Sequence, residues 1–180
     1  MDLHEITEQT HDVILDLRYA TTNNFVGEII YDHARCFLHQ DAIPRLEKAI
    51  ILAARQGFRL KIFDAFRPQR SQEKLWAFCP NPDYVMDPAV GSNHTRGLAI
   101  DLTLVDPSGS ELDMGTPFDD FTTQSRHGAE LLADIGANRY LLVGIMVSAG
   151  WGTITTEWWH YQLPGAKDYP LIMADPGLMG

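Results

Sequence analysis

The chain has 180 residues, of which 45% are hydrophobic, and its 14 Lys and Arg against 24 Asp and Glu give a formal net charge of −10. A chain of this length forms one substantial core and has little room for a second, so we expect a single domain over residues 1–180. The acidic balance argues against binding to nucleic acid or an anionic membrane, because both require a basic face. A small or zwitterionic partner fits this charge better.

The N-terminal stretch MDLHEITEQTHDVILDL has no basic segment followed by an apolar run. The longest apolar-rich stretch, YLLVGIMVSA at 140–149, is too short to span a bilayer and is typical of a buried helix. The sequence therefore predicts a cytoplasmic protein with no membrane contact. In that compartment we expect Cys36 and Cys79 to stay reduced rather than form a disulfide.

The first part of the chain predicts a strand, a helix and a second strand. Apolar and polar residues alternate over 13–17, as in a strand. Apolar side chains recur at helical spacing over 42–56, with Asp41 as the predicted cap. Alternation returns over 58–64, so Arg67 is expected just beyond the end of a strand.

The later part of the chain mixes helices and strands without a regular βαβ rhythm. The expected elements are, in chain order, a helix over 71–78 capped by Ser71, a strand over 98–104, helices over 125–135 and 138–149, and a strand around 151–162. Three prolines in CPNPDYVMDPAVGSN, at 79–93, predict a long irregular loop of the kind that often carries function. Since no glycine-rich phosphate loop follows a strand, an α+β domain is favoured over a nucleotide-binding α/β fold.

Three residues have the composition of a catalytic zinc site. Such a site needs three ligands of the His, Asp or Glu type and one open position for water, and His94, Asp101 and His160 meet that count. On an uninterrupted strand, residues seven apart face opposite sides, so the chain must turn near Gly97 to bring His94 to Asp101. The other histidines lie in polar surroundings and look incidental: His4, His11, His33, His39 and His127.

Glu157 and Arg67 are the candidate catalytic side chains. Glu157 can accept a proton from a metal-activated water and deliver it to the leaving amine, and we expect a loop-to-strand transition between it and His160. The planar guanidinium of Arg67 is suited to stabilising the oxyanion of peptide hydrolysis. Simpler roles stay open, namely a surface ion pair for Glu157 and a pair with Asp64 for Arg67, and the latter could also orient a catalytic Arg67.

Five segments, in this order, resemble the D-alanyl-D-alanine dipeptidase family known from bacterial vancomycin resistance. They are RYATTNNF at 18–25, FDAFRP at 63–68, SNHTRGLAIDLTL at 92–104, MGTPFDDF at 114–121 and EWWHYQL at 157–163. The resemblance implies one zinc ion per chain on the same three ligands, with the same base and the same arginine. It adds Asp119 as the residue that holds the substrate's ammonium group, and Ser92 as a residue close to the dipeptide.

The resemblance also implies a fold and an activity. The implied fold is a compact α+β domain with a central, mostly antiparallel sheet and flanking helices, as in zinc D,D-carboxypeptidases and the hedgehog signalling domain. The implied activity is hydrolysis of D-Ala-D-Ala to two D-alanines, so the expected partner is a small zwitterionic dipeptide. The alternatives are a carboxypeptidase for longer cell-wall peptides, which Asp119 disfavours, and a non-catalytic zinc module, which Glu157 and Arg67 disfavour.

Overall fold

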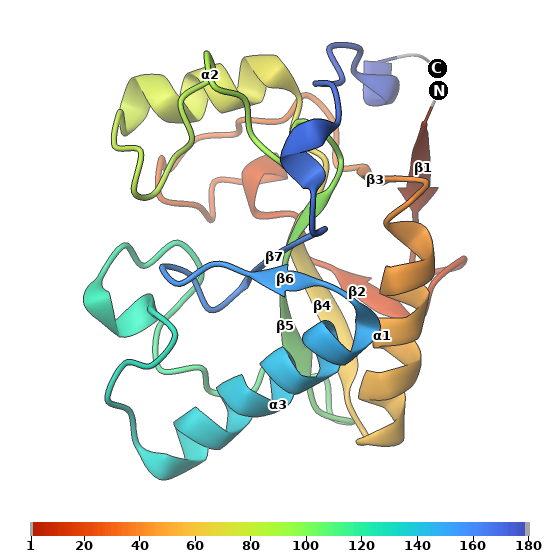
Figure 1. Ribbon diagram of the computed structural model, residues 1–180, viewed down its shortest axis with the longest axis vertical. Coiled ribbons are helices and arrows are strands. Elements are labelled where there is room, and N and C mark those ends of the chain that lie inside the picture. The colour runs from red at the N-terminus through yellow and green to blue at the C-terminus, as the bar shows by residue number, and fades with distance from the viewer. Residues whose placement is uncertain (1, 179–180) are drawn as a thin grey trace.

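The computed structural model describes residues 2–178, and its centre is a five-stranded sheet in the order β2-β4-β5-β7-β6 (Figure 1). The strands are β2 Val13–Leu15, β4 Arg59–Asp64, β5 Ala99–Val105, β6 Gly152–Thr153 and β7 His160–Gln162. The pair β2 and β4 is parallel, and the other three neighbouring pairs are antiparallel. The predicted α+β class with a mostly antiparallel sheet is confirmed. The ends of the predicted domain, Met1, Met179 and Gly180, lie outside the described residues.

Three helices and a second, smaller sheet surround these strands. The helices are α1 Ile43–Arg55, α2 Gln69–Phe78 and α3 Ala133–Ala149, and the small antiparallel sheet pairs β1 Leu3–Ile6 with β3 Cys36–His39. Helices α1 and α3 pack against each other on one side of the large sheet, whereas α2 lies farther away among loops (Figure 1). Within residues 2–178, no helix combines the length and the apolar character needed to cross a membrane.

The main core joins the sheet to α1 and α3. Helix α1 contributes Leu46, Ala49 and Ala53, all fully buried, at the i, i+3, i+7 spacing that makes one helix face apolar. Strand β5 is buried along its whole length, and Ile100 and Leu102 belong to this core. A second cluster lies beside α2 and consists of Tyr19, Ile30, Tyr31, Leu75 and Val85.

The elements predicted for the first part of the chain are confirmed, but two predicted caps are wrong. Asp41 does not cap α1, because the N-cap position is Ala42, which makes no side-chain cap. The Asp41 carboxylate instead accepts a hydrogen bond from the Tyr169 hydroxyl at 2.9 Å. Helix α2 begins two residues before Ser71, since the carbonyl of Pro68 already accepts hydrogen bonds from the N–H groups of Ser71 and Gln72.

Of the two helices predicted over 125–135 and 138–149, the second lies within α3 and is confirmed, whereas the first is wrong because α3 begins only at Ala133. Before it lie a 3-10 turn, Thr123–Ser125, and an irregular segment. That segment does not continue as a helix because its backbone bonds to another part of the chain. The N–H of His127 donates to the Thr155 carbonyl, and the Ser125 carbonyl accepts from Trp158.

The single strand predicted around 151–162 is also wrong. The structure has two short strands there, β6 and β7, which pair antiparallel and are joined by an irregular connection. Strand β6 is only two residues long, and the chain then leaves the sheet before it returns at His160.

Candidate functional site

The site begins on the two central strands. On β5, Asp101 alternates with Ile100 and Leu102, so its side chain lies on the opposite face of the sheet from theirs. Strand β4 reaches that face through a register shift, because Ile62 pairs with Leu102 whereas Asp64 pairs with Asp101. The resulting β-bulge turns Asp64 toward the side of Asp101, and an unbroken strand would leave it on the side of Ile62.

The tight turn before β5 brings His94 to these carboxylates. Gly97 has φ +67, and a Cβ atom there would lie 2.7 Å from Leu3 Cδ2 and 3.0 Å from the backbone nitrogen of His39. That nitrogen donates to the Gly97 carbonyl at 2.8 Å. Only glycine fits both the conformation and the close approach. The turn predicted near Gly97 is therefore confirmed, and its reason is contact with β3 as well as backbone freedom.

The last part of the site comes from the start of β7. His160 is the direct cross-strand partner of Asp101, and Glu157 lies before the strand, where the chain is irregular. Trp158 and Trp159 form the turn between them, and both are buried. The expected loop-to-strand transition is confirmed, and it lets Glu157 and His160 share one side of the molecule although they are three residues apart.

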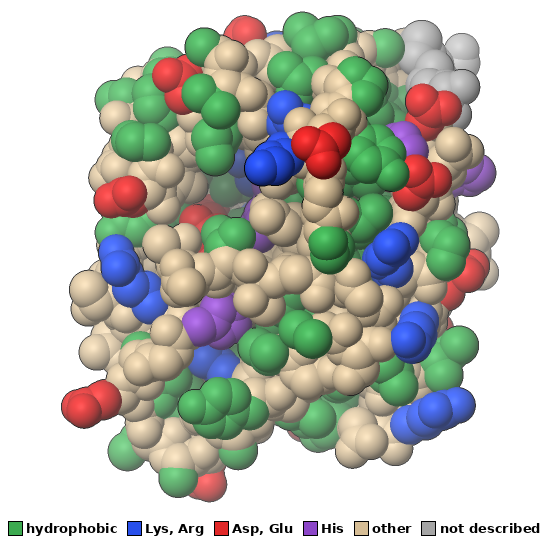
Figure 2. All heavy atoms as spheres, in the orientation of Figure 1, with side chains coloured by type: hydrophobic (Ala, Val, Ile, Leu, Met, Phe, Trp, Pro, Cys, Tyr) green, Lys and Arg blue, Asp and Glu red, His purple; other side chains and the backbone are tan. Residues whose placement is uncertain are grey.

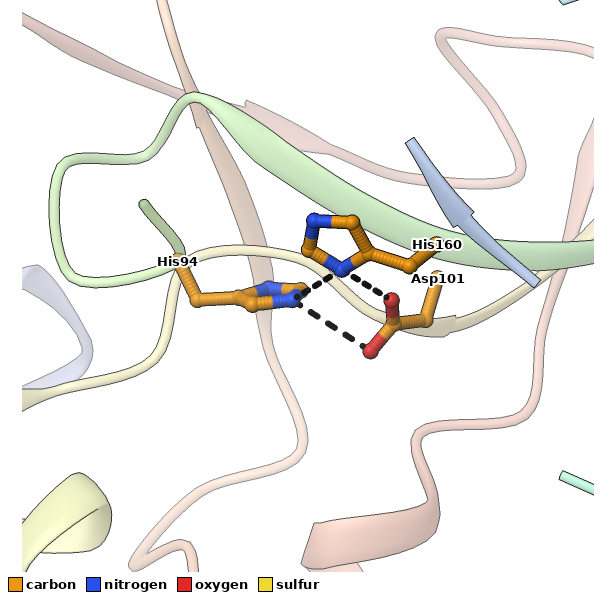
Figure 3. Close-up of side chains that lie close together, drawn as sticks. All are labelled: His94, Asp101 and His160. Atoms are coloured by element: carbon orange, nitrogen blue, oxygen red, sulfur yellow. Dashed lines mark hydrogen bonds and ion pairs between the residues drawn. The ribbon is translucent and has the colours of Figure 1, made fainter. Parts of the chain in front are cut away.

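The side chains of His94, Asp101 and His160 point toward one another (Figure 3). His160 Nδ1 lies 3.0 Å from Asp101 Oδ1, His94 Nε2 lies 3.4 Å from Asp101 Oδ2, and the two imidazole nitrogens are 3.2 Å apart. The other ring nitrogens have partners outside this group. His94 Nδ1 lies 2.8 Å from the Ala65 carbonyl, and His160 Nε2 lies 3.1 Å from Gln162 Oε1. Since both partners are acceptors, a neutral ring at either position can place its proton on the outer nitrogen, which leaves the lone pair of the inner nitrogen available to a metal ion.

This donor set fits a divalent metal ion. Two neutral imidazoles and one carboxylate are the ligand types of catalytic metal sites with an open position, and their ligand atoms lie within 4.8 Å of one another. Burial by itself would raise the pKa of Asp101, but the charges and hydrogen bonds of His94 and His160 lower it well below its usual range. The carboxylate is therefore ionised, as a metal ligand must be.

All the predicted site residues line one cavity of about 370 Å³. They are Arg67, Ser92, His94, Asp101, Asp119, Glu157 and His160. On the face drawn in Figure 2 the surface is hollowed between the region of α2 and that of β6 and β7, and acidic and histidine atoms are visible inside. Its walls include Phe25, Tyr84 and Phe121, from three separate loops. A cavity of this size suits a small ligand rather than an extended chain.

Glu157 is buried, with 8% of its surface exposed, and its Oε2 lies 4.0 Å from His160 Nδ1. Burial raises the pKa of Glu157 to about 8; His160 opposes this rise, and the carboxylates of Asp101 and Asp119 add to it. A carboxyl group with such a pKa can exchange a proton near neutral pH. No surface cation pairs with Glu157 among the described ion pairs, so the simpler role considered from the sequence has no support.

Arg67 is buried and makes the ion pair with Asp64 that the sequence left open. Its Nε and Nη2 donate to Asp64 Oδ2 at 3.0 and 2.7 Å, and its Nη1 donates to Gln72 Oε1 at 3.0 Å. Its Nη2 also lies 3.9 Å from Asp101 Oδ2, and its guanidinium carbon lies 5.0 Å from the centre of the Tyr19 ring. Burial opposes the positive charge, but Asp64 raises the pKa of Arg67 well above its ordinary value. A charged, rigidly held guanidinium thus lies beside Asp101.

Asp119 and Ser92 lie on loops at the wall of the cavity. Asp119 has φ +60, a conformation that few residues other than glycine adopt, and its Oδ2 accepts a hydrogen bond from the Tyr19 hydroxyl at 2.9 Å. Burial, with the nearby charge of Asp101, raises the pKa of Asp119 well above its usual value. A cationic group of a ligand would compensate this carboxylate. Ser92 Oγ accepts from the backbone N–H of His94 at 3.1 Å.

Several residues that organise the site were not predicted. Tyr31 donates to Asp64, Tyr19 donates to Asp119, and Gln162 is hydrogen-bonded to His160. For Gln162 a signal exists in the sequence, because residues i and i+2 of a strand share a face. Tyr31 is 33 residues from Asp64 in the sequence, and Tyr19 is 100 residues from Asp119. No local sequence pattern reveals contacts over such separations.

Comparison with known proteins agrees with this geometry. The model of a family described as D-ala-D-ala dipeptidase matches residues 1–176. A D-alanyl-D-alanine dipeptidase of Escherichia coli is 48% identical over 162 residues, which cover 89% of this chain and 84% of that protein. Proteins of the same name from Enterococcus faecium and Enterococcus faecalis are 34% and 32% identical, over 88% of this chain and 89% of each relative. The chain therefore belongs to the D-ala-D-ala dipeptidase family, whose members are metal-dependent peptidases.

Proposed function

We propose that this protein is a zinc dipeptidase that hydrolyses D-Ala-D-Ala to two D-alanines. The observation that carries the proposal is the convergence of the ligand atoms of His94, Asp101 and His160 beside the buried carboxyl group of Glu157. The relatives named above are D-alanyl-D-alanine dipeptidases, which supports this substrate. Zinc is favoured over harder divalent ions because imidazole nitrogens supply two of the three ligands.

The chain's own residues supply the groups that peptide hydrolysis needs. A zinc ion on these ligands would lower the pKa of a coordinated water to about 7 and polarise the scissile carbonyl. Glu157 takes the proton from the attacking water on its carboxylate and later delivers it to the departing amine. Asp64 holds Arg67 through two hydrogen bonds to one oxygen, so the guanidinium stabilises the developing oxyanion without reorganising.

Substrate selection is assigned to Asp119 and Ser92. In this proposal the Asp119 carboxylate pairs with the free ammonium group of the dipeptide, and Ser92 binds close to its backbone. An acylated amine carries no charge, so a blocked or extended peptide would leave the carboxylate buried without a counterion. The 370 Å³ cavity adds a limit on size.

The test is a comparison of three substrates with zinc-loaded protein: D-Ala-D-Ala, N-acetyl-D-Ala-D-Ala and a longer peptide ending in D-Ala-D-Ala. Cleavage of the free dipeptide alone is expected. Cleavage of the blocked or longer peptides would assign a carboxypeptidase instead. No cleavage of any of them by metal-replete protein would assign a non-catalytic zinc module.

Asp119→Asn tests the ammonium contact separately, since it keeps the shape of the side chain and removes its charge. We expect a rise in KM for D-Ala-D-Ala with metal content unchanged. An unchanged KM would contradict the assignment of Asp119.

The cytoplasmic location expected from the sequence stays a prediction. Fractionation of cells that produce the full-length protein would test it.

A further inference from the structure

Gln162 connects two parts of the chain that carry the proposed metal ligands. It lies two residues after His160 on β7, and its Oε1 lies 3.1 Å from His160 Nε2. The same oxygen accepts a hydrogen bond from Asn93 Nδ2 at 2.8 Å. Asn93 immediately precedes His94, so one amide oxygen bridges the strand of one histidine and the turn of the other.

The arrangement fixes which nitrogen of His160 can bind a metal. His160 directs Nδ1 toward Asp101 and His94, so a neutral ring that binds a metal through Nδ1 carries its proton on Nε2, which then needs an acceptor. Gln162 Oε1 supplies that acceptor, and the N–H of Asn93 keeps the amide from turning its NH₂ group toward His160. If the amide did turn, two donors would face each other in a partly buried place.

The two histidines differ in what holds them. His94 Nδ1 donates to the carbonyl of Ala65, a backbone group that no substitution removes. His160 depends on the side chain of Gln162. The backbone at Asn93 and at Gln162 is already fixed by other contacts. The Asn93 carbonyl accepts a hydrogen bond from Leu98 N at 3.0 Å, and Gln162 pairs with Ala99 of β5. A change at Gln162 therefore acts on the ring of His160 rather than on the course of the chain.

We propose that Gln162 is a positioning residue, which holds His160 as an Nδ1 ligand and is itself oriented by Asn93. The inference rests on the proposed metal site. Outer partners of histidine ligands orient the ring and raise its basicity, and their loss costs about 10- to 100-fold in metal affinity or activity.

The first measurement is the zinc dissociation constant of the full chain, by competition with a chromogenic chelator. Gln162→Met removes the acceptor at similar volume, and we expect about 10- to 100-fold weaker binding. Gln162→Glu keeps an acceptor and should bind zinc at least as tightly as the unaltered protein. Asn93→Ala should weaken binding less than Gln162→Met. Gln9→Met makes the same change at an exposed glutamine in a surface turn and serves as the matched control.

The second measurement is the tautomer of His160 in the zinc-loaded protein, from long-range ¹H–¹⁵N correlations of its imidazole ring. The proton is expected on Nε2, and a proton on Nδ1 would overturn the inference. Thermal unfolding of the metal-free proteins is the control for folding. Equal melting temperatures for Gln162→Met and the unaltered chain would show that the fold is retained. If Gln162→Met binds zinc like the unaltered protein, this inference fails while the proposed function stands. If the unaltered protein binds no zinc, both fail.

Discussion

The two faces of the central sheet are equally buried but are built in opposite ways. On the side of α1 and α3, β5 contributes Ile100, Leu102 and Leu104, which pack in a continuous apolar core. On the other side the same strand presents Asp101, which is 3% exposed and surrounded by imidazole, guanidinium and carboxyl groups. Burial of apolar area stabilises the first face, whereas on the second the ion pairs largely offset the cost of burying their charges.

The contrast between the faces predicts which substitutions change stability and which change activity. A cavity in the apolar face weakens the whole fold and leaves the chemistry of each folded molecule unchanged. A change of one atom on the polar face should abolish the chemistry and leave the fold largely intact.

Glu157→Gln, on the polar face, should reduce kcat for D-Ala-D-Ala by about 10²- to 10⁴-fold, because an amide cannot accept and deliver the proton. Zinc content and melting temperature should stay close to those of the unaltered protein. Steady-state kinetics and metal analysis provide the check, with Glu130→Gln, at an exposed loop position, as the matched control. A variant that keeps more than a tenth of the activity would remove Glu157 from the mechanism.

Leu102→Ala, on the apolar face, should lower the free energy of unfolding by about 2–5 kcal/mol, since Leu102 is fully buried and the cavity cannot fill. Urea unfolding followed by fluorescence measures this loss. Under conditions where the variant is folded, its kcat should equal that of the unaltered protein. A large fall in kcat of the folded variant would show that the two faces are not separable.

Gly97 connects the two faces, because the turn at this residue joins β5 to His94 and packs on Leu3 and His39. The variant Gly97→Ala tests this connection. We expect a loss of about 1–3 kcal/mol from the strained positive φ, together with weaker zinc binding as His94 shifts. Gly57→Ala is the matched control: it also has a positive φ, +81, but a Cβ there meets no atom within 4 Å. That control should lose stability without losing zinc affinity, and equal zinc affinities in both variants would refute the link.

Gly136→Ala should give the smallest effect, a gain of about 0.4–1 kcal/mol in the free energy of unfolding. Gly136 lies within α3, and a Cβ there meets no atom within 4 Å. Alanine lowers the backbone entropy of the unfolded chain at no steric cost. A rise in melting temperature with unchanged kcat is expected, and a fall would mean that glycine has a structural role in α3.

The sequence predicts the apolar face better than the polar one. Alternation over 58–64 and 98–104 and the helical spacing over 42–56 each depend on neighbours in the chain, and the structure confirms all three. The start of α3 could not be predicted in this way, because apolar residues occur around most of that helix and give no clear periodicity.

On the polar face, residue type was enough to propose the metal ligands but not their surroundings. The bulge in β4 that aims Asp64 at the site has no local sequence signal. Tyr19 and Tyr31 also arrive through long-range contacts. Asp119 and Ser92 were implied by resemblance alone; the structure places both on the cavity wall, and their roles stay predictions.

The order of the ligands along the chain has a consequence for biosynthesis. His94 and Asp101 emerge close together, whereas His160 follows Asp101 by 59 residues. At about 5–20 residues per second, the ribosome needs roughly 3–12 s more to deliver β7. During that interval the nascent chain offers only an imidazole and a carboxylate, a pair that retains metal poorly. If these three residues are the ligands, metal capture is expected to be completed only when β7 pairs with β5.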